Sequence, residues 1–376
     1  MHICHLTLGH SPYDDRIYYK ELWSLRGWAD TISLIAREVS EPEISYSDIQ
    51  VVPFPLKSLR KNLVRICNLA VELQADLYHL HEAELLMLAP WLRRRTNAAI
   101  VYDMHEPLPE VIRDFSPASY PKRMLVSFLL GALEHIGLPL VDGVVFTARP
   151  LAQQMRWATR DHAIIYNFPR RDIFNRPDPE IAQDDFTVLY QGQIAPARGI
   201  SELITGFGKF YQREKAGKLR IIGRYDPPEY ESELRCRISD QNLEPVVVLN
   251  DPVPHSQMPQ VLARASVGIM ALFPTPAFRK SVQGKTFEYL ASGLPVIAGN
   301  YPSAHQFLGE NRAGIILEET TPSNIAAAIE KLYANPKLRN KMSENGIRAV
   351  ESHLNWSRMQ EELHKFYTRI FAKKRG

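Results

Sequence analysis

The sequence predicts an α/β protein with two domains, each built on a parallel β-sheet. The chain has 376 residues, more than one hydrophobic core usually organises, so two domains are expected. Short β-branched or apolar runs alternate with helical patterns, which indicates strand–helix–strand units and parallel sheets. A polar segment rich in turn-forming residues interrupts this alternation once, and the alternation then starts again.

Residues 1–168 are expected to form the first domain. Its strands are predicted in the runs HICHLTL, TISLIA, DLYHLH, AAIVYD and GVVFT. Its helices are predicted at 15–26, at 59–73, from residue 84, and on either side of the last strand. Residues 169–185 contain three prolines and are predicted to be a linker between the domains.

Residues 186–354 are expected to form the second domain. Its strands are predicted in the runs FTVLYQG, LRIIG, VVVL, VGIMAL, PVIAG and AGIIL. The last helix, within residues 355–376, is expected to pack back on the first domain. Because ligands bind beyond the carboxyl ends of parallel strands, two such sheets facing each other predict a site in the cleft between them.

Composition and charge exclude several classes of protein. A hydrophobic fraction of 45% with 23% charged residues is typical of a globular chain and not of a disordered one. A formal net charge of +3 gives little electrostatic basis for binding nucleic acid. The first residues do not resemble a secretory signal, so a cytoplasmic protein is expected.

The longest apolar run, residues 124–133, is interrupted by Glu134 and His135 before it reaches the length of a membrane span. We therefore expect it not to cross a bilayer. Two interpretations remain: a buried helix of the domain, or a helix that lies on an anionic membrane surface, helped by Lys122 and Arg123. The second interpretation predicts peripheral contact with the inner face of the cytoplasmic membrane.

The segment LYQGQIAPARGI, residues 189–200, has the features of a phosphate site. A strand ends near Gly192, a loop carries Arg198, and a helix begins at Gly199. A helix N-terminus and an arginine together suit a diphosphate. The alternative is an ordinary strand-to-helix turn with a solvent-exposed arginine. The segment is not a G-x-G-x-x-G fingerprint, so a nicotinamide cofactor is not indicated.

The segment QGKTFEYLASG, residues 283–293, is the second candidate. Residues 284–286 would open a helix whose free N–H groups can bind phosphate, and Glu288 could accept hydrogen bonds from a ribose diol. The alternative is a surface helix with a glutamate in its first turn, where the helix dipole favours it.

Together these segments resemble the family 4 retaining glycosyltransferases, whose fold is GT-B, with two Rossmann-like domains facing across a central cleft. KTFEYLASGLPVIAG looks like the donor-site signature of the family, and YQGQIAPARGISELI is similar to its diphosphate loop. IIG at residues 221–223, the stretch VYDMHEPLPE and Asn167 also fall where the family places them. The resemblance covers nearly the whole chain.

The resemblance implies roles for individual residues. Glu288 would bind the donor ribose, Arg198 would neutralise the leaving diphosphate, and His105 would approach the transferred sugar, although a histidine at a strand end is often structural. The remaining donor-binding residues would be Gly192, Gln193, Gly223, Arg224, Val253, Lys280, Gln283, Gly284, Lys285 and Thr286. The family needs no metal, so neither a metal nor another cofactor is expected; the nucleotide sugar is a co-substrate.

Two positions depart from the family pattern. Lys280 stands where the family commonly has another glutamate, and Gln193 stands where many members have arginine. The contacts to the sugar hydroxyls and part of the phosphate charge compensation are therefore open. Lys280 either reaches an anionic or N-acetylated sugar or points to solvent.

The loop GHSPYDDR of the first domain holds Asp14, Asp15 and Arg16 at a helix entry. An aspartate there is either an N-cap or, with Arg16, part of an acceptor site, to which His81 and Glu106 are also assigned. His79 and His81 alternate at a strand end, but the sequence shows no third well-placed metal ligand, so no metal site is predicted.

The reaction implied is transfer of a sugar from a UDP- or GDP-linked donor to an acceptor hydroxyl, with retention of the anomeric configuration. The acceptor expected from the resemblance is a glycan or polyprenyl-linked glycan of lipopolysaccharide, capsule or exopolysaccharide; a soluble acceptor is the alternative. Two rival functions are a nucleotide-sugar 2-epimerase and a catalytically silent sugar-nucleotide-binding protein, which Lys280 and Gln193 make conceivable.

Overall fold

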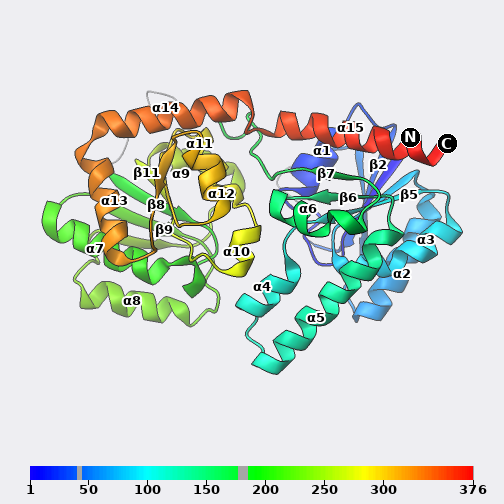
Figure 1. The fold of residues 1–376 in the computed structure, drawn as a ribbon, viewed down its shortest axis with the longest axis horizontal. Helices are drawn as coiled ribbons and strands as arrows, with labels where there is room; N and C mark the ends of the chain where they lie inside the picture. The colour runs from blue at the N-terminus through cyan, green and yellow to red at the C-terminus, as the bar shows by residue number, and fades with distance from the viewer. Residues whose placement is uncertain (40–44, 177–184, 376) are drawn as a thin grey trace. The chain divides into compact units, whose positions relative to one another are not determined.

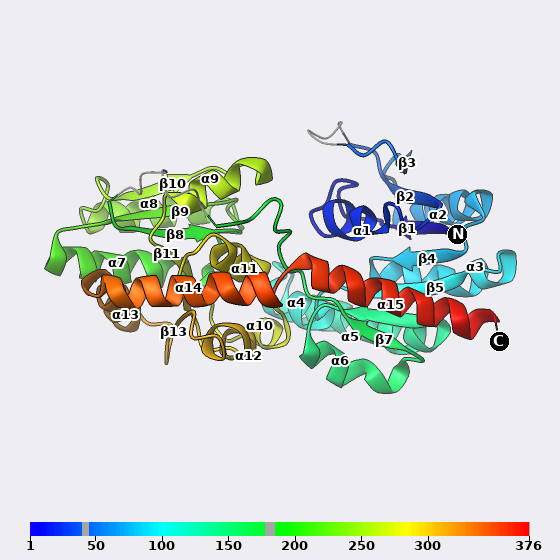
Figure 2. The same cartoon turned by 90° about the horizontal axis from the view of Figure 1, so that it is seen from above.

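The computed structural model describes residues 1–39, 45–176 and 185–375, and these form two compact units (Figures 1 and 2). The first unit contains Met1–Asn167 and Ser357–Gly376, and the second contains Phe168–Trp356. Each has its own sheet and core, and each is described by itself.

The first unit is built on a parallel sheet with the strand order β3-β2-β1-β4-β5-β6-β7. The strands are β1 (His2–Leu6), β2 (Thr31–Arg37), β3 (Ile49–Phe54), β4 (Leu77–Leu80), β5 (Ala99–Met104), β6 (Gly143–Phe146) and β7 (His162–Ile164). The helices are η1 (Ile17–Leu22), α1 (Trp23–Leu25), α2 (Leu59–Leu73), η2 (Ala83–Leu88), α3 (Ala89–Arg95), α4 (Leu108–Phe115), α5 (Tyr120–Gly137), η3 (Leu138–Leu140), α6 (Arg149–Met155), η4 (Arg156–Ala158) and α15 (Trp356–Arg375).

Helices cover both faces of this sheet. Tyr78 of β4 points to one face, where its hydroxyl donates to the Ala70 carbonyl of α2 at 2.5 Å. His79, the next residue, points to the opposite face and meets the Tyr367 hydroxyl of α15 at 2.5 Å. Since neighbouring residues of a strand point to opposite sides, α2 and α15 lie on opposite faces of the sheet.

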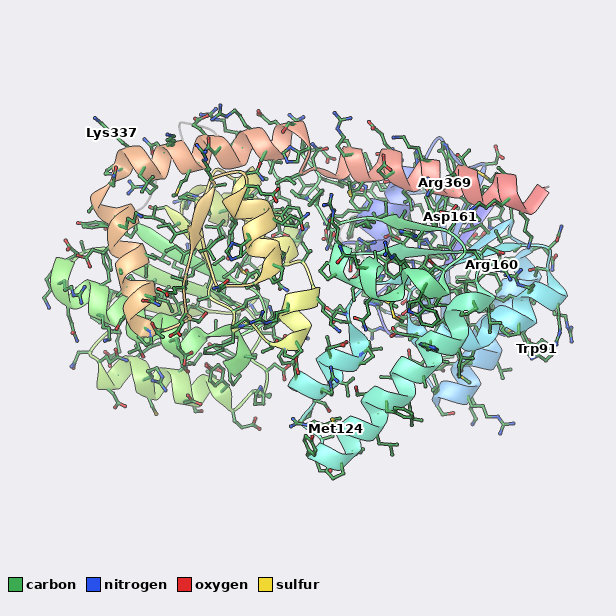
Figure 3. The ribbon with its side chains drawn as sticks, viewed as in Figure 1. Trp91, Met124, Arg160, Asp161, Lys337 and Arg369 are labelled. Atoms are coloured by element: carbon green, nitrogen blue, oxygen red, sulfur yellow. The ribbon has the colours of Figure 1, made fainter. Side chains whose placement is uncertain are left out.

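The last helix, α15, is part of the first unit from Ser357 onward. A Cβ on Gly143 of β6 would lie 2.6 Å from Ile370 Cδ1 and 2.7 Å from Phe366 Cζ, so only a glycine lets the helix approach this closely. At the surface, Arg369 lies 3.3 Å from the carboxylate of Asp161 (Figure 3). The expected return of the last helix to the first domain corresponds to this packing.

The second unit has a parallel sheet with the order β10-β9-β8-β11-β12-β13. The strands are β8 (Thr187–Gln191), β9 (Lys218–Ile222), β10 (Val247–Asn250), β11 (Val267–Met270), β12 (Val296–Ala298) and β13 (Gly314–Ile316). The helices are η5 (Pro196–Arg198), α7 (Ile200–Glu214), α8 (Tyr230–Asp240), η6 (His255–Gln257), α9 (Met258–Ala263), α10 (Pro276–Lys280), α11 (Gly284–Ala291), α12 (Pro302–Ala304), η7 (His305–Gly309), α13 (Pro322–Ala334) and α14 (Pro336–Ser352). Two parallel sheets confirm the predicted fold class.

Several details differ from the sequence-based expectations. The predicted linker falls partly on residues 177–184, which lie outside the described residues. Its described part is packed: Phe174 is buried, and the neighbouring Phe168 meets the ring of Phe287 at 4.6 Å. The edge strands β3 and β7 were not predicted, because β3 contains a proline and β7 has only three residues.

Helix α5 contradicts the expectation that the apolar run is too short to span a membrane. Together with η3 it runs from Tyr120 to Leu140 and, by length and composition alone, it is a described helix that could cross a membrane. Only 22% of its most apolar window is buried. The apolar character extends past Glu134 because this glutamate turns inward, where it is buried and meets the Tyr102 hydroxyl at 3.2 Å.

Candidate functional site

In the second unit, a tight turn connects β8 to α7 at the sheet position where the strand order reverses. Gly199 enters α7 with a φ of 69°, and a Cβ there would lie 2.2 Å from the Ala271 carbonyl oxygen. Gly223, after β9, approaches Gly192 so closely that a Cβ would lie 1.6 Å from the Gly192 oxygen. Both glycines are therefore required, and they hold the loop beyond the carboxyl ends of the strands, where ligands of such sheets bind.

Arg198 lies in this loop and is half-buried. Its Nη2 donates to Gln193 Oε1 at 3.2 Å, and its guanidinium lies 5.4 Å from the ring centre of Phe278. The amide of Gln193 donates in turn to Asp226. Gln193 thus positions the arginine and supplies no charge of its own.

Glu288, in the first turns of α11, is a buried carboxylate with 4% of its surface exposed. Gln191, the last residue of β8, donates from Nε2 to Glu288 Oε2 at 2.9 Å. Lys285 Nζ lies 2.9 Å from Oε1, and His255 Nε2 lies 4.0 Å from the same oxygen. Gln191 therefore joins the Arg198 loop to Glu288, and a ribose diol would have to replace part of these contacts.

The N-terminus of α11 is available to an anion in this structure. Within the described residues, no side chain caps the helix at Gln283, whose amide donates instead to Ser281 Oγ at 3.0 Å. Gly284 and Lys285 are half-buried, and Thr286 is buried. Exposed N–H groups at a helix start favour phosphate.

The other predicted donor residues lie around these loops. Arg224 follows β9, is exposed, and its carbonyl accepts from Ile194 N at 2.7 Å. Val253 is half-buried in the loop before η6, and Lys280 is half-buried at the end of α10.

In the first unit, the loop after β1 is organised by a carboxylate that the sequence did not indicate. Glu82, just after β4, accepts from the backbone N–H groups of Leu8 at 2.9 Å, Gly9 at 2.8 Å and His10 at 3.2 Å. The Thr7 hydroxyl donates to it at 2.6 Å. Glu82 therefore fixes the loop that holds the predicted acceptor residues.

Of those residues, Asp14 serves as an N-cap, since its Oδ1 accepts from the N–H groups of Arg16 at 2.8 Å and Ile17 at 3.1 Å. Asp15 accepts from Lys20 Nζ at 2.6 Å. Glu106 is exposed.

Arg16 and His81 are corrected by the structure, because both are buried, with 4% and 2% of their surface exposed. The Arg16 guanidinium lies 3.0 Å from Asp103 and 2.9 Å from Glu21. Burial alone would raise the pKa of Asp103, but Arg16 and His105 outweigh it and hold that pKa well below its usual range. Arg16 and His81 therefore make internal contacts and have almost no exposed surface with which to bind an acceptor.

His105 is the half-buried end of this network. Its Nε2 lies 3.0 Å from His81 Nδ1 and 3.3 Å from Asp103 Oδ2. Burial opposes protonation of His105, but the Asp103 carboxylate outweighs this effect and raises the pKa of His105. The side chain is therefore a candidate for a cationic, hydrogen-bonding contact to a ligand.

The statement that His79 and His81 lack further metal ligands is wrong. His5, from β1, and Glu21, from η1, lie with them, so that one ligand atom from each of the four residues is within 4.8 Å of the others. The sequence carried a signal for His5: β1 and β4 are neighbours in the common order of such sheets, and each strand has a histidine near its end. Glu21 had none, because its helix begins with an irregular π-turn.

A sequence model of the family described as Glycosyl transferases group 1 matches residues 172–349. The chain is 26% identical over 199 residues to the capsular polysaccharide biosynthesis glycosyltransferase CapM of Staphylococcus aureus, a match that covers 52% of this chain and 50% of CapM. It is 25% identical over 183 residues to the GDP-mannose-dependent alpha-(1-6)-phosphatidylinositol monomannoside mannosyltransferase of Mycobacterium tuberculosis, covering 48% and 46%. The chain spans about half the length of the curated relatives it matches.

Two solved structures resemble the whole chain. Sucrose-phosphate synthase from Thermosynechococcus elongatus has a TM-score of 0.80 with 17% identity, covering 99% of both chains. HepE of Anabaena in complex with UDP has a TM-score of 0.75 with 15% identity, covering 98% of this chain and all of HepE (100%). Both are GT-B proteins, and the likeness shows that this chain has the same fold.

Proposed function

We propose that the chain transfers a sugar from a nucleotide sugar to an acceptor hydroxyl, on the premise that residues 172–349 match the sequence model of the glycosyl transferases group 1 family. The observation that carries the proposal is the position of Glu288. It is a buried carboxylate beside the uncapped start of α11, and Gln191 joins it to the loop of Arg198. A carboxylate that can accept hydrogen bonds from a diol and two elements that can bind phosphate thus meet at one edge of the sheet.

Arg198 and the α11 N-terminus have complementary tasks. Both offer donors to the diphosphate, where negative charge develops as the donor breaks apart. Arg198 is half-buried, and a guanidinium gives paired donors to phosphate oxygens. Glu288 would accept hydrogen bonds from the ribose hydroxyls. Lys285, whose Nζ lies 2.9 Å from the Glu288 carboxylate in this structure, would then be released to bind phosphate.

The proposed reaction forms a bond between the anomeric carbon and the acceptor oxygen and breaks the bond from that carbon to the diphosphate. The acceptor hydroxyl proton passes to the departing diphosphate oxygen, on the same face of the sugar, so the configuration is retained. His105 is the proposed contact to the transferred sugar. This chemistry requires no metal ion at the diphosphate, because Arg198 and the helix N-terminus supply the compensating charge.

The donor is proposed to carry UDP or GDP. HepE was solved with UDP-glucose, and the mycobacterial relative is named as GDP-mannose-dependent. The acceptor is proposed to be lipid-linked, in capsule or a related surface polysaccharide. CapM is named for capsular polysaccharide biosynthesis, and the mycobacterial relative for a phosphatidylinositol glycoside.

Helix α5 supports a lipid-linked acceptor. Its outward face carries four large apolar side chains that are more than half exposed: Leu125, Phe128, Leu129 and Ile136. Lys122 is exposed at the start of the same helix. An apolar face with cations at its border suits a helix lying in the surface of an anionic membrane, so we propose peripheral binding at the cytoplasmic face.

The test measures binding of UDP-, GDP-, ADP- and CMP-sugars to the purified chain by thermal stabilisation and titration calorimetry, without added divalent metal and without a chelator. A ligand that binds only the native state raises the melting temperature. We expect one nucleotide class to stabilise the chain. Glu288→Gln and Arg198→Ala should weaken its binding by about 10- to 100-fold, the usual value of a charge-assisted hydrogen bond.

The matched controls are Arg213→Ala and Glu330→Gln. These two residues form an ion pair at 3.0 Å, and Arg213 lies at the opposite end of the helix that begins after Arg198. The controls should bind like the wild type. Binding of no nucleotide sugar, or equal binding by the controls and the two site variants, would exclude the proposed donor site.

A further inference from the structure

Three histidines converge on one buried face of the first sheet. His5 of β1 and His79 of β4 are partners in the register of neighbouring strands. His81 is two residues beyond His79 and therefore points to the same side. His5 and His79 have no exposed surface, and His81 has 2%.

A carboxylate joins them from the helix that covers this face. Glu21 of η1 is also fully buried, and neither of its oxygens has a hydrogen-bond partner among the described residues. Its Oε1 forms only an ion pair with Arg16 Nε at 2.9 Å, and its Oε2 points at the histidines. Arg16, which also pairs with Asp103, compensates the charge at Oε1, so Oε2 is the oxygen that lacks a compensating partner among the described residues.

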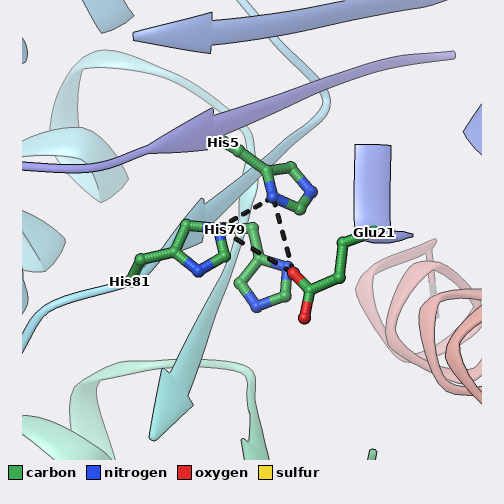
Figure 4. Close-up of side chains that lie close together, drawn as sticks. All are labelled: His5, Glu21, His79 and His81. Carbon is green, nitrogen blue, oxygen red and sulfur yellow. Dashed lines mark hydrogen bonds and ion pairs between the residues drawn. The ribbon is translucent and has the colours of Figure 1, made fainter. Parts of the chain in front are cut away.

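We propose that His5, Glu21, His79 and His81 bind a divalent transition metal, with zinc as the preferred ion (Figure 4). His5 Nδ1, His81 Nε2 and Glu21 Oε2 are separated from one another by 2.8, 3.8 and 3.9 Å. Ligand atoms of a tetrahedral zinc lie about 3.4 Å apart, so the two Glu21 distances are slightly longer than this, and the two imidazole nitrogens, now 2.8 Å apart, would separate by about 0.6 Å on binding. His79 supplies the fourth ligand.

The outer nitrogens of the histidines are already held, as in known metal sites. Tyr367 of α15 places its hydroxyl 2.5 Å from His79 Nδ1 and 3.3 Å from His5 Nε2. His81 Nδ1 lies 3.0 Å from His105 Nε2. His5 Nδ1 and His81 Nε2 are hydrogen-bonded to each other at 2.8 Å, and metal binding would replace this contact. His79 Nε2 has no hydrogen-bond partner among the described residues.

Burial favours the neutral form of all four groups: it raises the pKa of Glu21 well above its usual range, so metal binding would displace a proton from this carboxyl. Burial lowers the pKa of His79 to about 3, and burial also holds the pKa values of His5 and His81 well below the ordinary range. Neutral imidazoles are the form that binds metal. Four protein ligands with almost no exposed surface leave no position for substrate, so the metal is structural and separate from the sugar transfer.

The test is the metal content of the full chain, produced with zinc, manganese, iron, cobalt and nickel supplied in turn and purified without chelator. We expect inductively coupled plasma mass spectrometry to find about one zinc per chain. Removal of zinc by a strong chelator should lower the melting temperature, and adding zinc back should restore it. Cobalt should give the visible absorption bands of tetrahedral coordination.

The variants are His5→Asn and Glu21→Gln, with His162→Gln as the control, an exposed histidine of the same unit. The two variants should lose the metal, and the control should keep it. Should the variants not fold, the chelation and cobalt measurements on the wild type decide. Wild-type protein that binds no more metal than the variants, or that shows no tetrahedral cobalt spectrum, would overturn the proposal.

This result is separable from the donor test. Nucleotide-sugar binding depends on Arg198 and Glu288 in the second unit, whereas metal binding depends on four residues of the first. Either proposal can fail while the other stands.

Discussion

Gly199 shows how a single backbone position prepares the donor loop. Its φ of 69° is the left-handed conformation, and its neighbour on that side is the carbonyl of Ala271, which cannot move without distorting the end of β11. Arg198 precedes it directly, so the direction of the arginine depends on this turn. Backbone geometry here positions a charge.

We expect Gly199→Ala to destabilise the second unit and to weaken nucleotide-sugar binding. The left-handed conformation alone costs an alanine about 1–2 kcal/mol, and the contact of 2.2 Å adds to this. The control is Gly293→Ala, which has a similar φ of 72° but meets only the side chains of Ser343 and Ile347, at 3.1 and 3.2 Å. Thermal unfolding and calorimetry check both; equal effects of the two variants would contradict the expectation.

Residues that act through local patterns could be predicted, and residues that act through long-range contacts could not. Glu288 and Arg198 lie in contiguous motifs, and the structure places both at the same sheet edge. Gln191, which joins them, is an ordinary strand residue in the sequence, and Glu82 meets its loop only through the pairing of β1 with β4. Arg16 was assigned to the surface because a loop position does not reveal that its side chain turns inward.

At the scale of elements, α5 combines an exposed apolar face with a buried acid. Glu134 has 3% of its surface exposed, and burial raises its pKa to about 7, while the Tyr102 hydrogen bond acts in the opposite direction. The inner face of the helix is therefore sensitive to pH in the physiological range.

The sign of this effect follows from linkage. Because the folded-state pKa of Glu134 is raised, the acid stays protonated in the folded chain after the unfolded chain has lost the proton. Its contribution to stability is complete below about pH 4.5 and is lost as the pH rises through about 7. We expect Glu134→Gln to be more stable than the wild type at pH 8 by on the order of 2–3 kcal/mol.

Denaturant unfolding across pH 4–8 checks this expectation, with Glu72→Gln, an exposed position on α2, as the control. The control should keep the wild-type pH dependence, and Glu134→Gln should flatten it. A wild-type stability that does not fall between pH 5 and 8 would contradict the assigned cause.

The type of each long element could be predicted from periodicity, as α2, α7 and the central strands show. The irregular elements could not: η1 and η7 are π-helical, and no pattern of apolar residues marks such turns. The predicted helix at 15–26 begins at Ile17 for this reason. The length of α5 was also misjudged, because a glutamate in the sequence does not show which side of the helix it occupies.

At the scale of the whole molecule, two sheets of parallel strands could be predicted, because two series of alternating elements are local features of the sequence. Which side chains from distant parts of the chain pack against each other could not be derived from periodicity. Tyr78 and Tyr367 look alike in the sequence, yet one closes α2 onto the sheet and the other places α15 over the histidines.

The proposed membrane binding is tested on the intact chain by vesicle flotation. We expect binding to phosphatidylglycerol vesicles and weaker binding to phosphatidylcholine. Phe128→Ser should lower binding by about 10- to 150-fold, since burying a large apolar side chain contributes about 1.5–3 kcal/mol. Val248→Ser, an exposed apolar position in the second unit, is the control. Equal binding of both variants would assign membrane contact to another surface.

The first unit contains residues from both ends of the chain, and this has a consequence for synthesis on the ribosome. After Asn167 has been made, the second unit, Phe168–Trp356, must follow before α15 exists. At about 5–20 residues per second this takes about 10–40 s. During that interval Tyr367 is absent, and α15 does not yet cover the face of β1 and β4 that carries the three histidines. A metal ion could therefore reach these histidines in the nascent chain more easily than in the finished fold.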